Sequence, residues 1–336
     1  MGGKFYKILK VKAIALLSGG LDSILAVKLI LEQGIEVEGV TFETPFFSAR
    51  KARSMAKKVG LPLVIIDITE EHLEMLKAPR YGYGKNMNPC IDCHILMLKI
   101  AGKRMEETGA DFVFTGEVLG QRPMSQGRQS LDLVAKRSGY QEYILRPLSA
   151  KLLPETKPEI ESKVDRQKLL DLQGRSRKRQ IEMARCYGIT DYSTPAGGCL
   201  LTDPMFSKRL KDLFKHHRDF RIRDIELLKF GRHFRINNTT RVIVGRNSLD
   251  NEAIQRFYEE GDILIHMTHF PGPTAIVPDG ADEADEKVCR HAAAICAYYS
   301  DAPKDVENIA TCKAGKNVTL ITTKAFSRGD VEQWMI

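Results

Sequence analysis

The residues with the clearest chemical pattern are Ser18-Gly19-Gly20-Leu21-Asp22-Ser23. Glycines let a backbone turn tightly and bring successive N–H groups onto an anion, and a following helix adds the positive end of its dipole. Gly-Gly also occurs in ordinary tight turns, but the polar residues Ser18, Asp22 and Ser23 around it favour a phosphate-binding loop. The Gly-Lys-Ser/Thr ending of a Walker loop is not present.

Three of the seven cysteines form a second candidate site. Cys90 and Cys93 are spaced as CxxC at a helix start, and Cys199 follows two glycines. A lone CxxC is either a pair of core thiols or half of a zinc site. At a helix start we expect a lowered thiol pKa, which favours the thiolate for nucleophilic attack or metal binding. The remaining cysteines are predicted to be buried thiols: Cys186, Cys289, Cys296 and Cys312.

The elements that must position these residues alternate between strands and helices. Strands are predicted over 11–17, 35–41, 63–68, 112–115 and 143–145, and helices over 22–33, 48–59 (with Ser48 as N-cap) and 92–109. Such alternation predicts an α/β fold with a parallel sheet and helices on both faces. Ligands of these sheets bind beyond the carboxyl ends of the strands, where the glycine loop lies.

The chain of 336 residues is 43% hydrophobic and 28% charged, with a mean hydropathy of −0.26. This composition is typical of a folded globular protein and argues against wholesale disorder. The longest apolar stretches are far shorter than the roughly 20 residues that a bilayer requires. Seven scattered cysteines do not form a disulfide framework. We therefore expect a cytoplasmic protein with no membrane contact.

The positive charge is concentrated in one part of the chain. The formal net charge is +8, and residues 166–235 contain 17 Lys and Arg against 8 Asp and Glu. A basic stretch of this kind is usually a solvated surface, but it also suits a polyanion, with nucleic acid as the first candidate. Arg175, Arg177, Lys178 and Arg179 fall within five residues; on a helix they would spread around it, which suits contacts with a phosphate backbone.

Ser-Gly-Gly-x-Asp-Ser resembles the PP-loop of the ATP pyrophosphatases, whose fold is adenine nucleotide alpha hydrolase-like. Thr115-Gly116-Glu117-Val118-Leu119-Gly120-Gln121, Ser125-Gln126 and Arg146-Pro147-Leu148 resemble segments of tRNA 4-thiouridine synthases. One residue is inserted before Ser125, and a further insertion spans about 151–178. The resemblance implies an enzyme that binds ATP and Mg²⁺ and adenylates a carbonyl oxygen, with ATP bound by Leu17, Ser18, Gly19, Gly20, Asp22, Ser23, Thr41, Phe42, Gly116, Glu117, Gln121 and Gln126.

One CxxC with a distant third cysteine resembles the cluster-dependent tRNA thiouridine synthases of the same superfamily. The resemblance implies that Cys90, Cys93 and Cys199 hold a [4Fe–4S] cluster with one iron open, since thiolates suit iron–sulfur chemistry. The same residues allow a competing chemistry, in which one cysteine carries a persulfide and another resolves it as a disulfide. The catalytic residues implied are Asp22 and these three cysteines.

The C-terminal part carries a separate resemblance. Val242-Ile-Val-Gly245-Arg246-Asn247, Gly261-Asp262-Ile-Leu-Ile-His266 and Pro271-Gly272-Pro273 resemble the NFACT-type RNA-binding domain. We expect this domain to take the place of the RNA-binding module that precedes the PP-loop in 4-thiouridine synthases. We predict a PP-loop domain over 1–150, an exposed basic arm and a helical segment with the third cysteine over 151–239, and an RNA-binding-like α+β domain over 240–336.

The leading hypothesis is an ATP-dependent tRNA sulfurtransferase that makes 4-thiouridine, with 2-thiouridine as the alternative. Its partners would be tRNA and a sulfur donor, either sulfide or a cysteine desulfurase, and it could act as a homodimer. A PP-loop ligase or amidotransferase-type enzyme acting on a small carboxylate, with structural cysteines, is a second hypothesis that predicts no RNA requirement. A non-catalytic RNA-binding scaffold is a third, against which the intact PP-loop counts.

Overall fold

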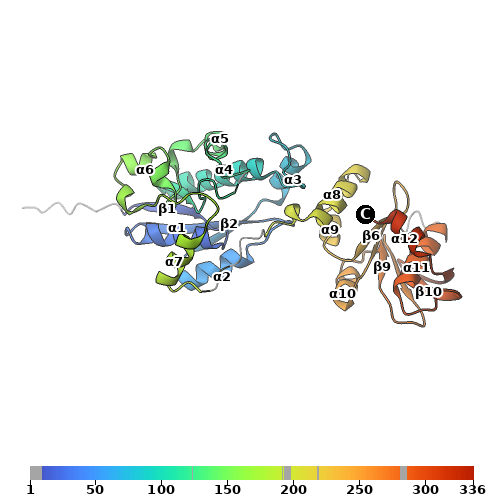
Figure 1. Cartoon of the computed structure of the whole chain (residues 1–336). Helices are drawn as coiled ribbons and strands as arrows, with labels where there is room; N and C mark the ends of the chain where they lie inside the picture. Colours follow the sequence, from blue (N-terminus) through green and yellow to red (C-terminus); the bar gives the residue numbers. More distant parts are fainter. Residues whose placement is uncertain (1–9, 123, 191, 193–197, 218, 281–285) are drawn as a thin grey trace, which may run out of the picture. The chain divides into compact units, whose positions relative to one another are not determined.

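The computed structural model describes residues 10–122, 124–190, 192, 198–217, 219–280 and 286–336 (Figure 1). The chain divides into two compact units, which meet in the sequence at Thr202 and Asp203. The predicted middle segment 151–239 is thus shared between the two units. Within the described ranges, no helix is both long and apolar enough to cross a membrane.

The first unit is built on a parallel sheet with the strand order β3-β2-β1-β4-β5. Its central strand β1 pairs Leu16 with Val40 of β2 and with Thr115 of β4. The carboxyl ends of these three strands therefore lie together at one edge. The strands are β1 (Lys12–Leu16), β2 (Glu36–Glu43), β3 (Leu63–Asp67), β4 (Phe112–Thr115) and β5 (Ile144–Leu145).

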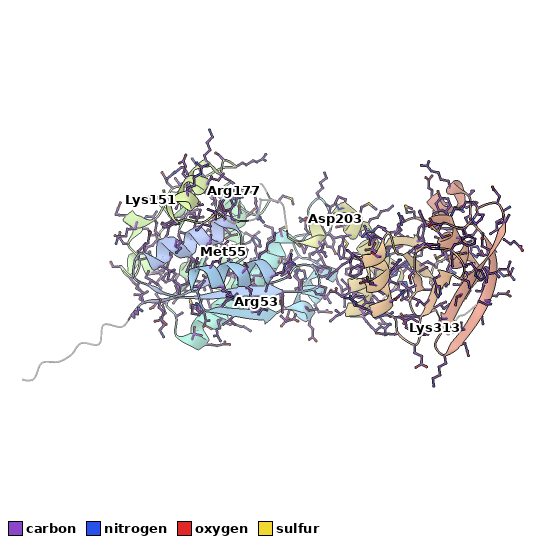
Figure 2. All side chains as sticks on the ribbon, turned by 90° about the horizontal axis from the view of Figure 1, so that it is seen from below. Arg53, Met55, Lys151, Arg177, Asp203 and Lys313 are labelled. Atoms are coloured by element: carbon purple, nitrogen blue, oxygen red, sulfur yellow. The ribbon has the colours of Figure 1, made fainter. Side chains whose placement is uncertain are left out.

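Helices cover both faces of this sheet, as Figure 1 shows. One apolar cluster joins the sheet to α1 (Leu21–Leu31), α2 (Arg50–Val59) and α7 (Lys178–Cys186). The other joins it to α4 (Cys90–Thr108) and α5 (Arg128–Ser138). Together with α3 (Thr69–Lys77), these helices confirm the predicted fold class. On α2, Met55 is buried and Arg53 is exposed (Figure 2).

Two local predictions differ from the structure. The N-cap of α2 is Ala49 rather than Ser48, and no side chain caps it. The segment predicted as an exposed arm packs on the sheet domain, because Leu170 N and Leu172 N donate to the carbonyl oxygens of Pro147 and Leu148. That segment contains α6 (Lys157–Ile160) and the 3-10 turns Ala150–Leu152 and Arg166–Lys168. Two further 3-10 turns in the first unit are Gln141–Tyr143 and Leu200–Thr202.

The second unit is an antiparallel sheet with the strand order β11-β10-β8-β9-β7-β6. One face packs on α11, whose alanines and cysteines join the buried strand residues in one core. The strands are β6 (Arg232–Arg235), β7 (Arg241–Val244), β8 (Ile263–Met267), β9 (Ala275–Val277), β10 (Glu307–Ala314) and β11 (Asn317–Lys324). The helices are α8 (Pro204–His216), α9 (Ile222–Leu227), α10 (Ser248–Arg256), α11 (Glu286–Tyr299) and α12 (Arg328–Trp334).

The other face of that sheet is covered at β7 and β9, where Ile243 and Ile276 pack with Leu227 of α9 and Ile254 of α10. At β10 and β11 the same face is exposed. Lys313 of β10, labelled in Figure 2, lies over the ring of Tyr258, 4.9 Å from its centroid. Val318 and Leu320 of β11 are exposed, and so is His266 of β8. This sheet and its helices form the predicted C-terminal α+β unit. Helices α8 and α9 belong to the same compact unit, because it begins at Asp203.

Candidate active site

The glycine loop connects β1 to α1 at the carboxyl edge of the parallel sheet. Gly19 has φ +72°, and a Cβ there would lie 2.4 Å from the carbonyl carbon of Lys51 in α2. A side chain is thus excluded by backbone conformation and by space. Leu17 N donates to Val40 O at 2.8 Å, which fixes the loop beside the buried residues Thr41 and Phe42 at the end of β2.

Hydrogen bonds between neighbouring residues hold the turn in its conformation. Ser23 Oγ donates to Gly20 O at 2.8 Å, and Gly20 N donates to Ser18 Oγ at 3.3 Å. Ser18 is exposed, whereas Ser23 is buried. Gly20 is the N-cap of α1, and no side chain caps that helix. Its first N–H groups are therefore available to an anion.

The end of β4 reaches the same place. A Cβ on Gly116 would lie 2.5 Å from Ser23 N and from Ser23 Cα, so the two motifs meet backbone to backbone. Farther along the β4 loop, Gln126 is buried and its Oε1 has no hydrogen-bond partner in the described part of the chain. A buried unpartnered acceptor is uncommon in proteins without a ligand or water to satisfy it.

Asp22, in the first turn of α1, is held by side chains from two distant segments. Gln121 Nε2 donates to Asp22 Oδ2 at 2.7 Å, and Arg177 Nη2 forms an ion pair of 2.9 Å with the same oxygen. Gln180 Nε2 donates to Gln121 Oε1 at 3.0 Å. The other oxygen, Asp22 Oδ1, is buried without a partner among the described residues. It fits a cation such as Mg²⁺, which prefers carboxylate oxygens.

Glu117 is satisfied within the protein. Its Oε2 accepts a hydrogen bond from Arg146 Nε at 3.0 Å, and its Oε1 lies 3.2 Å from His94 Nδ1. Burial opposes ionisation of Glu117, but Arg146 and His94 outweigh burial and lower the pKa of Glu117 to about 2. His94 follows Cys93 on α4. Through its contact with His94, Glu117 therefore links the loop after β4 to the helix that carries Cys90 and Cys93.

Cys90 and Cys93 lie in the first turns of α4. Asn88 Nδ2 donates to Cys90 Sγ at 3.2 Å. Asp92, between the two cysteines, accepts hydrogen bonds from the backbone N–H groups of Arg80 and Tyr81 at 3.1 and 3.0 Å. Asp92 thus anchors the preceding loop. Cys90 and Cys93 are three residues apart on α4, so they share one face of the helix.

Cys199 comes from a separate segment that is pinned to the same region. Leu200 N donates to Phe46 O at 2.9 Å, and Asn86 Nδ2 donates to Thr202 O at 2.7 Å. The loop around Cys199 is therefore tied both to the turn after β2 and to the loop before Cys90. Residues 194–197 of the Thr194–Cys199 motif lie outside the described residues.

The thiols of this region influence one another. Burial raises the pKa of the Cys93 thiol, and repulsion from Cys199, Cys90 and Asp92 raises it further. Burial raises the pKa of Cys199 to about 11, against hydrogen bonds from the backbone of Leu201 and Thr202. The predicted lowering at the helix start is therefore wrong for Cys93, because burial and like charge outweigh the helix dipole. The three cysteines and the loops that tie their segments together are called the cysteine neighbourhood.

The described ranges contain no group of three or more His, Cys, Asp or Glu arranged to hold a metal ion, and this includes Cys90, Cys93 and Cys199. Elsewhere in the chain, Cys289, Cys296 and Cys312 are buried, as predicted. Cys186 is exposed, contrary to prediction, because the apolar face of α7 that meets the core carries Ala184 rather than Cys186.

The basic residues of 175–179 do not lie on a single helix. α7 begins at Lys178, so Arg175 and Arg177 lie in the preceding turn. Arg177 is only 16% exposed because it pairs with Asp22, whereas Arg175 and Lys178 are exposed. Its pairing with Asp22 could not be read from the sequence, since the two residues lie 155 positions apart. The predicted RNA contacts of this segment stay predictions.

Two family models match separate parts of the chain. The model described as Thiamine biosynthesis protein (ThiI) matches residues 9–162. The model of the NFACT protein RNA binding domain matches residues 231–335. Both matches fall on the segments that carried the two resemblances in the sequence, and they confirm them.

Curated relatives match shorter stretches. A tRNA-specific 2-thiouridylase MnmA of Syntrophotalea carbinolica is 33% identical over 30% of this chain and 32% of its own length. A probable tRNA sulfurtransferase of Thermococcus kodakarensis is 34% identical over 41% of this chain and 36% of its own. The chain thus spans about a third of the length of these relatives. A 4-thiouridine synthetase crystallised with RNA and ATP is 23% identical, with a TM-score of 0.39 over 65% of this chain and 52% of that one.

Proposed function

Residues 9–162 form a PP-loop domain of the ThiI type and residues 231–335 a domain of the NFACT type, and from this premise we propose that the chain is an ATP-dependent tRNA sulfurtransferase. It adenylates a uridine carbonyl oxygen of tRNA and replaces that oxygen with sulfur. The observation that most supports this proposal is that the glycine loop and the three cysteines belong to the same compact unit. The ion pair of Glu117 with His94 connects the loop after β4 to the helix of Cys90 and Cys93.

The first half-reaction uses the glycine loop. The uridine oxygen attacks the α-phosphorus of ATP, and pyrophosphate leaves. The free N–H groups at the start of α1 stabilise the charge that develops on the pyrophosphate. Asp22 Oδ1, buried without a partner among the described residues, would hold Mg²⁺, while Thr41, Phe42 and Gln126 line the nucleotide.

In the second half-reaction, sulfur attacks the activated carbon and AMP leaves. The sulfur comes from sulfide, or from a cysteine desulfurase as a persulfide, whose outer sulfur is released when a second cysteine of the site forms a disulfide. Cys90, Cys93 and Cys199 would hold a [4Fe–4S] cluster, because thiolates are the usual ligands of such clusters and the segment of Cys199 is tied to the loop before Cys90. When bound, such a cluster supplies an iron that no protein thiolate occupies. The raised pKa of Cys199 disfavours the free thiolate that both the cluster and the persulfide chemistry require, so iron and sulfide analysis decides between them.

Within this proposal the product is 4-thiouridine, since the Thr115–Gln121 and Arg146–Leu148 segments resemble those of the 4-thiouridine synthases. The 2-thiouridylases among the relatives favour the alternative oxygen. Nucleoside mass spectrometry separates the two, because 4-thiouridine and 2-thiouridine differ in retention and fragmentation.

The test is a reconstitution under anaerobic conditions with tRNA, radiolabelled ATP and sulfide. We expect AMP and pyrophosphate, dependent on tRNA, and one thiolated uridine for each AMP. Formation of ADP and phosphate would exclude the reaction class. AMP formation with a small carboxylate and without tRNA would replace the proposal with a ligase.

A further inference from the structure

The segment 175–180 presents two sets of side chains with different environments. Arg177 and Gln180 contact Asp22 and Gln121 of the nucleotide site, and Gln180 is 1% exposed. Arg177 Nε is buried with no partner in the described part of the chain. The position of α7, which carries Gln180, is fixed because its buried Ala184 packs in the same apolar cluster as α1.

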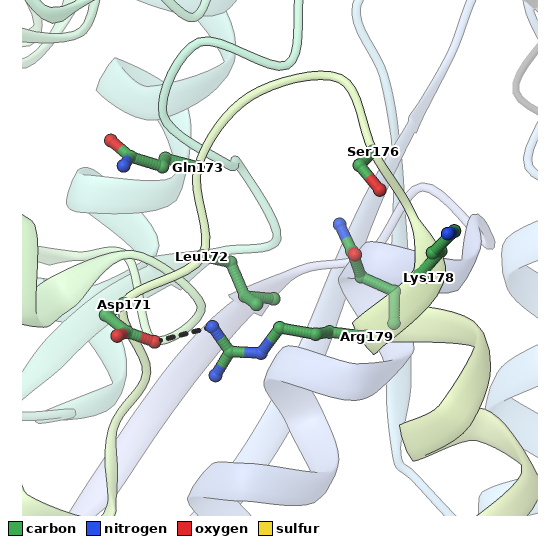
Figure 3. A pocket seen from close by; sticks show the side chains of 7 residues that line it. Asp171, Leu172, Gln173, Ser176, Lys178 and Arg179 are labelled. Atoms are coloured by element: carbon green, nitrogen blue, oxygen red, sulfur yellow. Dashed lines mark hydrogen bonds and ion pairs between the residues drawn. The ribbon is translucent and has the colours of Figure 1, made fainter.

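A cavity of about 270 Å³ is lined by Ser176, Lys178 and Arg179 of this segment and also by Gln180, which thus borders both environments (Figure 3). Ser176, Lys178 and Arg179 contribute a hydroxyl and two cations to its wall. Arg179 forms an ion pair of 2.8 Å with Asp171, drawn as the dashed line in Figure 3. Both partners of that pair are more than half exposed, and exposed pairs of this kind are weak. An anion entering the cavity can therefore take over Arg179.

The cavity and the nucleotide site share one short backbone segment. Lys178 and Arg179 are in the first turn of α7, directly between Arg177 and Gln180. A shift of that turn toward an anion would move the two side chains that hold Asp22 and Gln121. Gly174, at φ +79°, precedes the segment, and Gly174 N donates to Leu119 O at 2.7 Å, so the turn is anchored on its N-terminal side.

We propose that this segment couples the two substrates: a phosphate of the RNA backbone binds in the cavity at Ser176, Lys178 and Arg179, and Arg177 transmits its presence to Asp22. Arg177 is thus a positioning residue of the nucleotide site and not an RNA contact. The inference rests on the proposed function, since it requires that the chain bind ATP and RNA.

The experiment measures the affinity of the full chain for a non-hydrolysable ATP analogue with and without tRNA. In the unsubstituted protein we expect tRNA to tighten analogue binding by at least about fivefold, in the range of known coupling between sites. Reciprocity requires the analogue to tighten tRNA binding by the same factor. In Arg177→Ala we expect both factors to fall to about one, with tRNA affinity in the absence of the analogue unchanged.

Two further variants make the result specific. Lys178→Ala should weaken tRNA binding and lower its salt dependence, by a slope of about 0.9 for a phosphate contact on a duplex. Arg175→Ala, an exposed neighbour outside the cavity wall, should leave the coupling factors intact. Arg177→Gln, which keeps a hydrogen-bond donor but no charge, provides a second test if Arg177→Ala unfolds.

Coupling that persists in Arg177→Ala and Arg177→Gln overturns the inference and leaves the proposed function standing. So does a loss of tRNA affinity and salt slope in Arg177→Ala, which would make Arg177 a backbone contact. If the unsubstituted protein binds neither the analogue nor tRNA, the proposed function fails, and the inference fails with it.

Discussion

The glycine loop and the cysteine neighbourhood are built in different ways. The glycine loop is fixed by backbone packing, since Gly19 lies against Lys51 and Gly116 against Ser23 with no room for a methyl group. The cysteines depend on single hydrogen bonds between loops, such as Asn86 to Thr202. A change in the loop should therefore harm folding and nucleotide binding together, whereas a change at the cysteines should harm chemistry alone.

The largest effect is expected from Gly19→Ala. The added Cβ would lie 2.4 Å from the carbonyl carbon of Lys51, and the alanine would be held at a left-handed φ of +72°. We expect the variant to lose roughly 2–4 kcal/mol of unfolding free energy and to lose ATP binding. Gly60→Ala is the matched control, since Gly60 has φ +65° with open space around it and should cost only about 1 kcal/mol. Equal losses in urea unfolding would show that packing does not fix the loop.

Cys199→Ala should remove most of the iron and all thiolation while leaving the urea midpoint nearly unchanged. Cys186→Ala, at an exposed cysteine, is the control and should keep both. Iron and sulfide analysis after anaerobic purification gives the comparison. Full iron content in Cys199→Ala, or full activity of iron-free protein, would favour persulfide chemistry at these cysteines.

Glu117→Gln should change how stability responds to acid. The pKa of Glu117 is lowered from 4.5 to about 2 in the folded protein, so its contribution is present above pH 4.5 and is lost as the pH falls toward 2. That shift corresponds to roughly 3–4 kcal/mol. Urea unfolding between pH 5 and pH 2 should therefore show a steeper loss in the unsubstituted protein than in the variant. Parallel curves would contradict the ionised state of this buried carboxylate.

The smallest effect is expected from Asn86→Ala. The variant loses one hydrogen bond to Thr202 O, worth about 1 kcal/mol, and loosens the segment that follows Cys199. We expect a modest drop in iron retention during dialysis and no change in ATP affinity. A loss of ATP affinity equal to the loss of iron would mean that the two regions are not independent.

The sequence was informative where function depends on local backbone. The glycines of the loop and the strand before it follow from neighbouring residues, and the parallel sheet follows from the alternation of elements. Side-chain partners far apart in the chain could not be predicted. Nothing near Arg177 indicates that it pairs with Asp22, and nothing near Glu117 indicates His94 and Arg146. Short elements such as β6 and β9 were missed because they gain stability from their sheet neighbours rather than from a pattern of their own.

The packing of residues 164–184 against the sheet domain bears on where this chain could be divided. The buried side chains of Val164, Leu169, Leu172 and Ala184 complete the same apolar cluster as α1. A gene fragment that stopped at residue 162, where the ThiI match ends, would leave this surface open to water and to other chains. Such a fragment should be recovered as inclusion bodies, so the matched segment cannot be exchanged between proteins as a self-contained cassette.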